Sequence, residues 1–369
     1  MASFLGKGKG IHGVASGQRA GGCGVSLVVV LVSAISILAG NGPAHAQNAQ
    51  SSGLKPEVDA FVVKMAREHE FDALDLRKMF SQLEPNQTII KAIDAPATSK
   101  PWSYFRQLYV TPLRVDGGVA FWNEHAEWLQ KARQTYGVPE EIITSIIGVE
   151  TIYGQYTGKF RVVDALYTLG FEVPRRSRFF QGQFEHFLLL ARENAIEPTE
   201  VTGSFAGAMG IPQFMPSSYR QYAVDFDGDG RVDLWNSVAD AIGSVANYLS
   251  RFGWEAGEQI VLPAIVTADQ PEALVRLGVK PSLTVAEWRS RGVEIDGQIR
   301  ERTDAGFFSL EGEEGPQYWV SLYNFYVITR YNRSNNYAMA VYQLSQEIAQ
   351  QRRVQQAALA AGTDKLPQE

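Results

Sequence analysis

The chain has 369 residues, of which 45% are hydrophobic and 20% are charged, and its formal net charge is −6. An acidic chain without a run of lysine or arginine is a poor candidate for binding nucleic acid. The one cysteine excludes an intramolecular disulfide, so the stability of the fold must come from burial of apolar residues.

The first 46 residues have the pattern of a secretory signal peptide. Three basic residues precede an apolar run at 25–39, and Ala44-His45-Ala46 matches an Ala-x-Ala cleavage site. The run is too short for a comfortable membrane span, and Cys23 lies before it, where it does not form a lipoprotein acylation site. We expect a secreted protein that begins at Gln47 without a membrane span, with 31 basic and 40 acidic residues and a net charge of −9.

Apolar residues recur at helical spacing in several segments, which predicts a mainly α-helical protein with a small β element. After a flexible leader at 47–54, helices are expected over 55–80, 121–136, 178–194, 237–253 and 337–359. Residues 256–315 contain short alternating runs with valine, proline and glycine, which indicates a small β-containing insertion. The predicted organisation is a helical region at 55–255, this insertion, a return to the core at 316–360 and a tail at 361–369.

Glu150 is the leading candidate for a catalytic residue. It follows apolar residues at 143, 146 and 147, which lie on the same face of a predicted helix that begins near Pro139 and stops near Gly154. A carboxyl at the end of a core-facing stripe loses hydration, and this raises its pKa toward neutrality. The alternative is a glutamate at a helix end whose side chain turns to solvent.

The segment from Gly203 to Pro216 is long, uncharged and rich in small residues. Glycine and alanine allow the backbone to approach a ligand closely, and Ser204 and Gln213 are the main polar side chains of the segment. With Glu150, the segment is interpreted as the wall of a polymer-binding cleft. A tightly packed internal turn is the alternative interpretation.

A third motif is acidic and predicts a calcium site. Asp225, Asp227 and Asp229 occupy positions 1, 3 and 5 of an EF-hand-like loop, glycine follows at position 6, and the Arg231 carbonyl stands at position 7. Three carboxylates this close repel one another unless a cation lies between them. Position 12 is Asn236, where an EF-hand has glutamate. We expect a structural Ca²⁺ and no cofactor for catalysis.

Four motifs in order give the chain a resemblance to the lytic murein transglycosylase B family, also classed as glycoside hydrolase family 103. They are Gly148-Val-Glu-Thr151, Gly203-Ser-Phe-Ala-Gly-Ala-Met-Gly210, Pro216-Ser-Ser-Tyr219 and Tyr326-Val-Ile-Thr-Arg-Tyr-Asn332. The similarity extends over roughly residues 55 to 350. It implies a lysozyme-like catalytic core and a periplasmic enzyme that cleaves the β-1,4 bond between N-acetylmuramic acid and N-acetylglucosamine. The implied partner is the peptidoglycan glycan strand, and other cell-wall enzymes are candidates for further partners.

The family uses one glutamate first as acid and then as base, while the 6-hydroxyl of the sugar attacks C1 to form a 1,6-anhydromuramoyl end. Glu150 matches that glutamate, whereas Asp164 and Glu172 have no clear cleft position. The resemblance assigns substrate binding to a further set of residues: Ser204, Gln213, Tyr248, Tyr331, Asn332 and Tyr337. For each tyrosine, ordinary core packing is the alternative.

The sequence departs from the family at two aromatic positions. Phe105 and Phe179 stand where relatives can have tyrosine, so sugar stacking is expected to survive while a hydrogen bond is lost. In the family the acidic loop is longer, and its closing carboxylate aligns best with Asp240. A local alternative for Asp240 is a capping box with Ser237 at the start of the next helix.

Two other functions compete with the transglycosylase. A hydrolytic muramidase would cleave the same bond with water, and a non-catalytic protein would only bind the wall. The latter does not require an acid on an apolar helix face.

Overall fold

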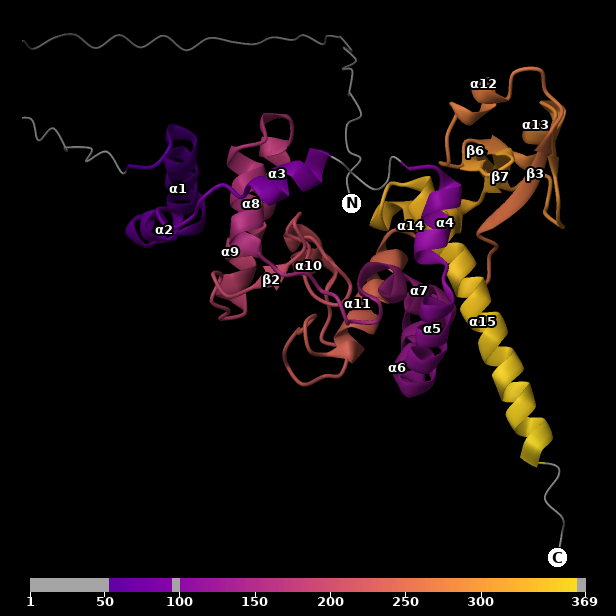
Figure 1. The fold of residues 1–369 in the computed structure, drawn as a ribbon, viewed down its shortest axis with the longest axis horizontal. Helices are drawn as coiled ribbons and strands as arrows, with labels where there is room; N and C mark the ends of the chain where they lie inside the picture. Colours follow the sequence, from indigo (N-terminus) through magenta and orange to yellow (C-terminus); the bar gives the residue numbers. More distant parts are fainter. Residues whose placement is uncertain (1–52, 95–99, 364–369) are drawn as a thin grey trace, which may run out of the picture.

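The computed structural model describes residues 53–94 and 100–363, over which the chain is mainly helical with a small β-sheet (Figure 1). The predicted signal peptide and most of the predicted leader lie outside these residues. The helices of the first part are α1 (Pro56–His69), α2 (Ala73–Phe80), α3 (Gln87–Asp94), α4 (Trp102–Tyr109), α5 (Pro112–Glu124), α6 (Ala126–Tyr136), α7 (Glu140–Thr151), α8 (Val162–Phe171), α9 (Ser177–Glu193), α10 (Pro216–Tyr222) and α11 (Val238–Arg251). The remaining helices are a 3-10 turn η2 (Pro174–Arg176), α12 (Pro271–Val275), α13 (Val285–Ser290), α14 (Tyr323–Tyr331) and α15 (Asn335–Thr363).

The predicted fold class is confirmed: the chain is mainly helical with a small β element. Two of the expected helices are nevertheless divided. The segment 55–80 breaks after α1 because Glu70 adopts a left-handed conformation (φ 58°) and the Asp72 side chain then caps α2 through the N–H groups of Leu74 and Asp75. The segment 121–136 begins inside α5, which ends at Glu124, and His125 separates it from α6.

The β-sheet has a small core of its own, while its residues Val261, Phe308 and Leu310 pack into the larger helical core. Its five strands are antiparallel in the order β4-β6-β7-β3-β5, with bounds β3 (Val261–Val266), β4 (Leu283–Thr284), β5 (Val293–Ile295), β6 (Asp304–Gly312) and β7 (Gly315–Ser321). Trp288 of α13 is fully buried against this sheet, and its indole N–H donates to the Ala305 carbonyl at 2.9 Å. The predicted boundary at 315 falls at the hairpin turn between β6 and β7, so the sheet extends to Ser321.

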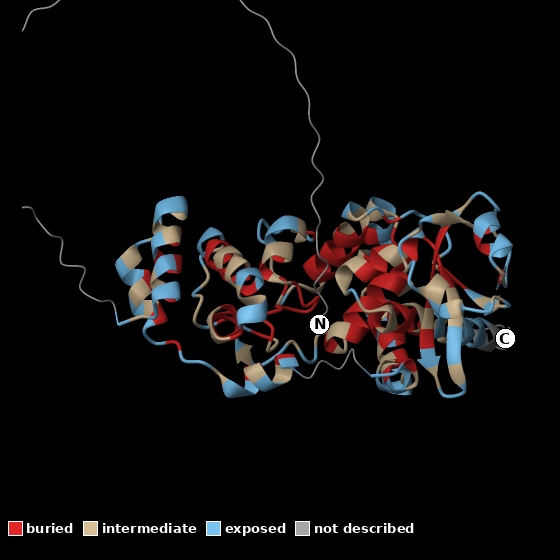
Figure 2. Cartoon of the chain, turned by 90° about the horizontal axis from the view of Figure 1, so that it is seen from above, coloured by how far each residue is buried: buried red, intermediate tan, exposed pale blue. Residues whose placement is uncertain are grey.

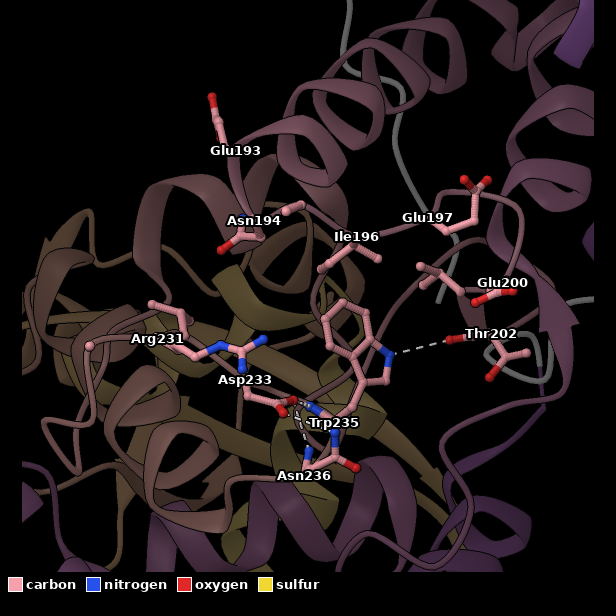
Figure 3. Close-up of a pocket in the computed structure, with 14 residues that line it drawn as sticks. Glu193, Asn194, Ile196, Glu197, Glu200, Thr202, Arg231, Asp233, Trp235 and Asn236 are labelled. Atoms are coloured by element: carbon pink, nitrogen blue, oxygen red, sulfur yellow. Dashed lines mark hydrogen bonds between the residues drawn. The ribbon is translucent and has the colours of Figure 1, made fainter.

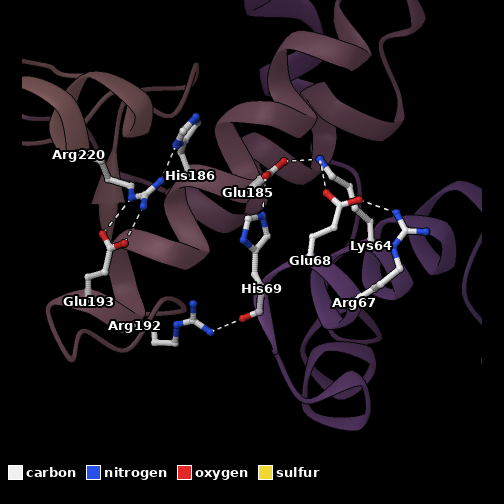
Figure 4. Close-up of polar contacts among 9 residues, drawn as sticks. All are labelled: Lys64, Arg67, Glu68, His69, Glu185, His186, Arg192, Glu193 and Arg220. Carbon is white, nitrogen blue, oxygen red and sulfur yellow. Dashed lines mark hydrogen bonds and ion pairs between the residues drawn. The ribbon is translucent and has the colours of Figure 1, made fainter.

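The helices form one larger core that positions the candidate site. Buried residues gather in the helices at the centre of the molecule, while α1 and α2 lie at one end and the β-sheet at the other (Figures 1 and 2). Among the described residues, no helix is both long and apolar enough to cross a membrane. Helix α1 is attached to α9 by Lys64 and His69, which both bind the Glu185 carboxylate (Figure 4).

The end of α7 is packed against its own chain through a tyrosine ring. Ile152 and Tyr153 adopt left-handed conformations (φ 51° and 59°), which turn the Tyr153 ring back against the backbone of α5 and α7. A Cβ added at Gly148 would lie 2.5 Å from the Tyr153 hydroxyl oxygen, and one at Gly117 would lie 2.8 Å from the ring. These glycines are therefore required by close packing.

We predict that Gly148→Ala destabilises the protein by about 1–3 kcal/mol, because the added methyl overpacks the end of α7. Gly182→Ala in α9 is the matched control, since no atom lies within 4 Å of a Cβ added at Gly182. Alanine there should raise the free energy of unfolding by up to about 1 kcal/mol through helix propensity. Urea unfolding of both variants measures the difference, and a Gly148→Ala variant as stable as wild type would contradict the packing argument.

Candidate active site

Glu150 lies in the last turn of α7 with its side chain half-buried. Pro139 precedes the helix, Glu140 and Glu141 stand in its first turn, and every apolar residue from 142 to 149 is buried. The burial that the sequence pattern predicts for this helix therefore extends to its final turn. Because the backbone turns left-handed directly after Thr151, Glu150 is held at the end of a rigid helix.

Tyr337 is the hydrogen-bond partner of the Glu150 carboxyl. Tyr337 lies in the first turn of α15, and its hydroxyl donates to Glu150 Oε1 at a distance of 2.7 Å. The two residues are 187 positions apart in sequence. Burial, opposed in part by the hydrogen bond from Tyr337, raises the pKa of Glu150 to about 7. The carboxyl can thus hold and release a proton near neutral pH, as an acid–base catalyst requires.

The three predicted tyrosines form one contiguous group of rings beside Glu150. The Tyr331 ring lies parallel to Tyr337, with a centroid separation of 6.4 Å and an interplanar angle of 7°, and it meets the Tyr248 ring at 4.9 Å. The Tyr331 hydroxyl donates to the Pro212 carbonyl at 2.6 Å, and the Tyr248 hydroxyl donates to the Arg330 carbonyl at 2.7 Å. Tyr248 and Tyr337 are buried, so these two rings also fit the alternative role of ordinary core packing.

The two polar side chains of the Gly-rich segment maintain its shape. Ser204 Oγ accepts the backbone N–H of Ala206 at 3.3 Å and of Ala208 at 3.0 Å. Gln213 has a positive φ of 52°, and its amide nitrogen donates to the Thr157 and Gly210 carbonyls at 2.9 Å each. Both residues are thus structural in this state, and substrate binding by them stays a prediction.

Thr151 was not singled out from the sequence, although it follows Glu150 directly. Its buried hydroxyl donates to the Ile211 carbonyl at 2.9 Å, which attaches the Gly-rich segment to the end of α7. The same oxygen accepts the Gly154 N–H at 3.0 Å. In the sequence, the position of Thr151 directly after Glu150 was the feature that could have indicated its role.

Arg114 of α5 was also missed by sequence reasoning. Its guanidinium donates to the Gly148 carbonyl at 3.2 Å and to the Leu108 carbonyl at 2.8 Å, and lies 5.2 Å from the centroid of the Tyr109 ring. A cation at the carboxyl end of α7 is favourable because that end carries partial negative charge. Burial lowers the pKa of Arg114, whereas burial and then the charge of Glu150 raise the pKa of Tyr109.

The other predicted substrate residues have different surroundings. Phe105 is buried and stacks on Tyr109 at 4.5 Å, so most of its surface is used for packing. Phe179 of α9 is 46% exposed, and its ring meets that of Phe180 edge to face with centroids 5.0 Å apart. Asn332 directly follows α14, and its side-chain oxygen accepts the Ser334 N–H at 3.2 Å.

The three aspartates of the acidic loop are brought together as the spacing predicts. A carboxylate oxygen from each of Asp225, Asp227 and Asp229 lies within 4.8 Å of the others. The donors that reach them are backbone N–H groups of the loop and the Ser237 hydroxyl, which donates to Asp227 at 2.7 Å. Clustered hard oxygen donors of this kind fit Ca²⁺.

Asp240 lies outside this carboxylate cluster, although the resemblance aligns it with the closing ligand. It is buried, and its two oxygens accept the backbone N–H groups of Phe226 at 2.7 Å and Asp233 at 2.8 Å. Burial raises the pKa of Asp240. Ser237 caps α11 by accepting the Asp240 N–H at 3.1 Å, which is one half of the suggested capping box. Asp240 therefore holds the loop from behind.

A half-buried carboxyl with a raised pKa, held at a helix end beside a group of tyrosine rings, is the arrangement of an acid–base enzyme. Residues 53–346 match the family model described as Transglycosylase SLT domain. The chain therefore belongs to this transglycosylase family.

Similar proteins agree with this assignment. Membrane-bound lytic murein transglycosylase B of Escherichia coli (strain K12) is 45% identical over 304 residues, which cover 80% of this chain and 83% of the relative. The crystal structure of soluble lytic transglycosylase SltB1 from Pseudomonas aeruginosa is 49% identical, with a TM-score of 0.75 over 80% of this chain and 99% of that one. Escherichia coli Slt35 in complex with calcium is 43% identical, with a TM-score of 0.74 over 80% of this chain and 94% of that one.

The raised pKa of Glu150 predicts a pH-dependent cost to stability. Below pH 4.5 the carboxyl is protonated in the folded and unfolded states alike. As the pH rises from 4.5 to about 7, the unfolded state ionises first, so the stability of the wild type falls, and the cost is complete above about pH 7. Glu150→Gln cannot ionise and should be more stable than wild type at pH 8, by on the order of 1–3 kcal/mol, but not at pH 4.

Urea unfolding at several pH values measures this difference. The exposed Glu127→Gln in α6 is the control, because it removes a carboxylate without changing a buried site. If wild type and Glu150→Gln showed the same pH dependence of stability, the Glu150 carboxyl would not be desolvated.

Proposed function

We propose that the chain cleaves the β-1,4 bond between N-acetylmuramic acid and N-acetylglucosamine in peptidoglycan and leaves a 1,6-anhydromuramoyl end. The observation that carries the proposal is the Glu150 carboxyl, whose pKa of about 7 and hydrogen bond to Tyr337 suit both donation and recovery of a proton. The lytic murein transglycosylase named among the similar proteins supports the choice of polymer.

The reaction needs one carboxyl in two steps. Protonated Glu150 donates its proton to the glycosidic oxygen while the bond from that oxygen to C1 breaks. The resulting carboxylate then accepts the proton of the 6-hydroxyl as its oxygen forms a bond to C1. The acid is restored, an anhydro ring is closed, and no water is consumed.

The environment of Glu150 favours this route over a mechanism with two carboxylates. Asp164 and Glu172 lie nearby in sequence, and both are engaged elsewhere. Asp164 forms a two-point ion pair with Arg161, at 2.7 and 2.8 Å, and Glu172 pairs with Lys55. A hydrolytic muramidase with the same glutamate remains the second candidate, and its product contains one more water.

The proposed setting is the periplasm, reached by means of the signal peptide at 1–46. The Escherichia coli relative is named as membrane-bound. In this chain Cys23 precedes the apolar run, so we propose a protein released from the membrane after cleavage. A protein that only binds the wall would not need Glu150 in its desolvated position.

Glu150→Gln should abolish cleavage of purified sacculi while it leaves folding and glycan binding intact. The amide keeps the shape of the acid but cannot deliver a proton, and loss of a general acid–base group lowers the rate by roughly 10²–10⁴ or more. Mass spectrometry of the wild-type digest should show anhydro products that are lighter by one water than hydrolytic products. A variant with near wild-type turnover would refute the role of Glu150, and hydrolytic products from wild type would favour the muramidase.

We further propose that Asp225, Asp227, Asp229 and the Arg231 carbonyl hold a structural calcium ion. The clustered carboxylates support this, and a calcium complex is known for the Slt35 relative. When bound, the ion would neutralise charge within the loop and would take no part in the chemistry. Asp240 would support the loop from the first turn of α11.

Calcium should raise the thermal midpoint of the mature chain, and Asp225→Ala with Asp229→Ala should remove that rise. A ligand that binds only the folded state stabilises it by about 2.7 kcal/mol at a hundredfold excess over its dissociation constant. Magnesium should act less because it prefers octahedral geometry and retains its water. The exposed Asp269→Ala should keep the full response. Melting curves that ignore both calcium and chelator would remove the metal from the proposal.

A further inference from the structure

A groove of about 580 Å³ lies where the segment after α9 meets the acidic loop (Figure 3). One wall is formed by residues 193–197 and 200–202, and the other by residues 230–233, 235 and 236. The volume falls within the range of about 300–1,000 Å³ that is typical of small-molecule sites. The catalytic step proposed for Glu150 uses none of these residues.

Trp235 gives this groove a fixed aromatic surface. Its ring packs on Tyr219 with centroids 5.4 Å apart, and its indole N–H points to the Thr202 carbonyl at 3.4 Å. Tyr219 is itself held by its hydroxyl, which donates to the Val232 carbonyl at 2.6 Å. A half-buried indole held in this way can stack on the apolar face of a sugar at little cost in side-chain entropy.

Carboxylate and amide groups surround the indole. Glu200 has no hydrogen-bond or ion-pair partner for its carboxylate among the described residues, so both of its oxygens can accept from a ligand. Asn194 donates to the Leu190 carbonyl, which leaves its side-chain oxygen as an acceptor. Glu193 at the rim is instead engaged by two bonds from Arg220, at 2.9 and 2.7 Å (Figure 4).

The charge of the groove selects among ligands. Glu197, Glu200 and Asp233 outnumber the single cation Arg231, so the groove repels a carboxylate-bearing sugar or peptide. An aromatic surface with acceptors at its edge suits an uncharged sugar whose hydroxyl and amide groups donate hydrogen bonds. The groove also lies close to the active site along the chain, since Thr202 is followed by Gly203 and Ser204.

We propose that this groove is a second glycan-binding site, which takes an uncharged N-acetylated hexosamine unit of the polymer. The inference rests on the proposed function for the identity of that polymer. Binding here would hold a neighbouring part of the glycan while Glu150 acts on the scissile bond, which raises the local concentration of substrate at the active site.

The test is a titration of the mature Glu150→Gln chain, in calcium, with the tetramer of N-acetylglucosamine. The chain has seven tryptophans, so its indole N–H groups give separate nitrogen–proton NMR signals. The Trp235 signal, identified by its loss in Trp235→Phe, should shift saturably with the tetramer. Calorimetry should show two bound tetramers per chain, with one of these sites weakened at least about tenfold in Trp235→Ala.

Matched variants separate recognition from folding. Trp235→Phe keeps an aromatic ring and should retain part of the binding, whereas Glu200→Lys should weaken it with an unchanged melting temperature. Trp122→Ala, at a half-buried tryptophan that contacts Arg352, and Glu127→Lys should leave both sites intact. The proposal would be overturned if the Trp235 signal stayed fixed while the tetramer saturated the active-site cleft beside Glu150. It would also be overturned if the signal responded to a diamine and not to the tetramer. Cleavage of sacculi by the wild type tests the proposed function separately.

Discussion

The desolvated carboxyl of Glu150 is the constraint on which the rest of the site depends. An acid in water has released its proton well below neutral pH, so it has none to give when a glycosidic oxygen needs it. Placing Glu150 in the last turn of a buried helix changes this, because burial disfavours the charged form. The same burial costs folding free energy above the unfolded pKa. The site therefore needs a surrounding structure that is rigid enough to bear that cost.

That rigidity comes from the end of α7, where several independent contacts meet. Thr151 attaches the Gly-rich segment, Arg114 binds the Gly148 carbonyl, and the Tyr153 ring fills the space left by glycines in α5 and α7. Each contact constrains the backbone within two or three residues of Glu150. None of them touches the carboxyl itself, so the acid keeps its freedom to exchange a proton while its position is fixed.

Sequence reasoning succeeded where the signal was local. Periodic apolar residues predicted α7 and the position of Glu150 at its end, and the spacing of Asp225, Asp227 and Asp229 predicted their convergence. It failed where the structure depends on long-range contacts or on unusual backbone conformations. The Tyr337–Glu150 bond spans 187 residues, and only the resemblance placed Tyr337 at the site.

The departures from expectation have the same origin. Glu70 and Tyr153 adopt left-handed conformations although neither is glycine, so their residue types do not predict these conformations. Asp240 was aligned as a ligand, but a carboxylate at a helix start can also accept backbone N–H groups, and the buried environment of Asp240 favours this use. In sequence, Trp235 resembles a packing residue. Its place in a groove is evident only from the structure, where two chain segments form walls around it.

The acidic loop and the catalytic acid are connected by a continuous series of contacts. Asp240 holds the loop at the first turn of α11, and Tyr248 follows two turns later on the same helix. The Tyr248 ring meets Tyr331, which lies parallel to Tyr337, whose hydroxyl bonds to Glu150. An ion in the loop would therefore act on catalysis only by keeping α11, and hence the group of tyrosine rings, in place. This is support through packing and requires no second state of the protein, in contrast to an allosteric switch.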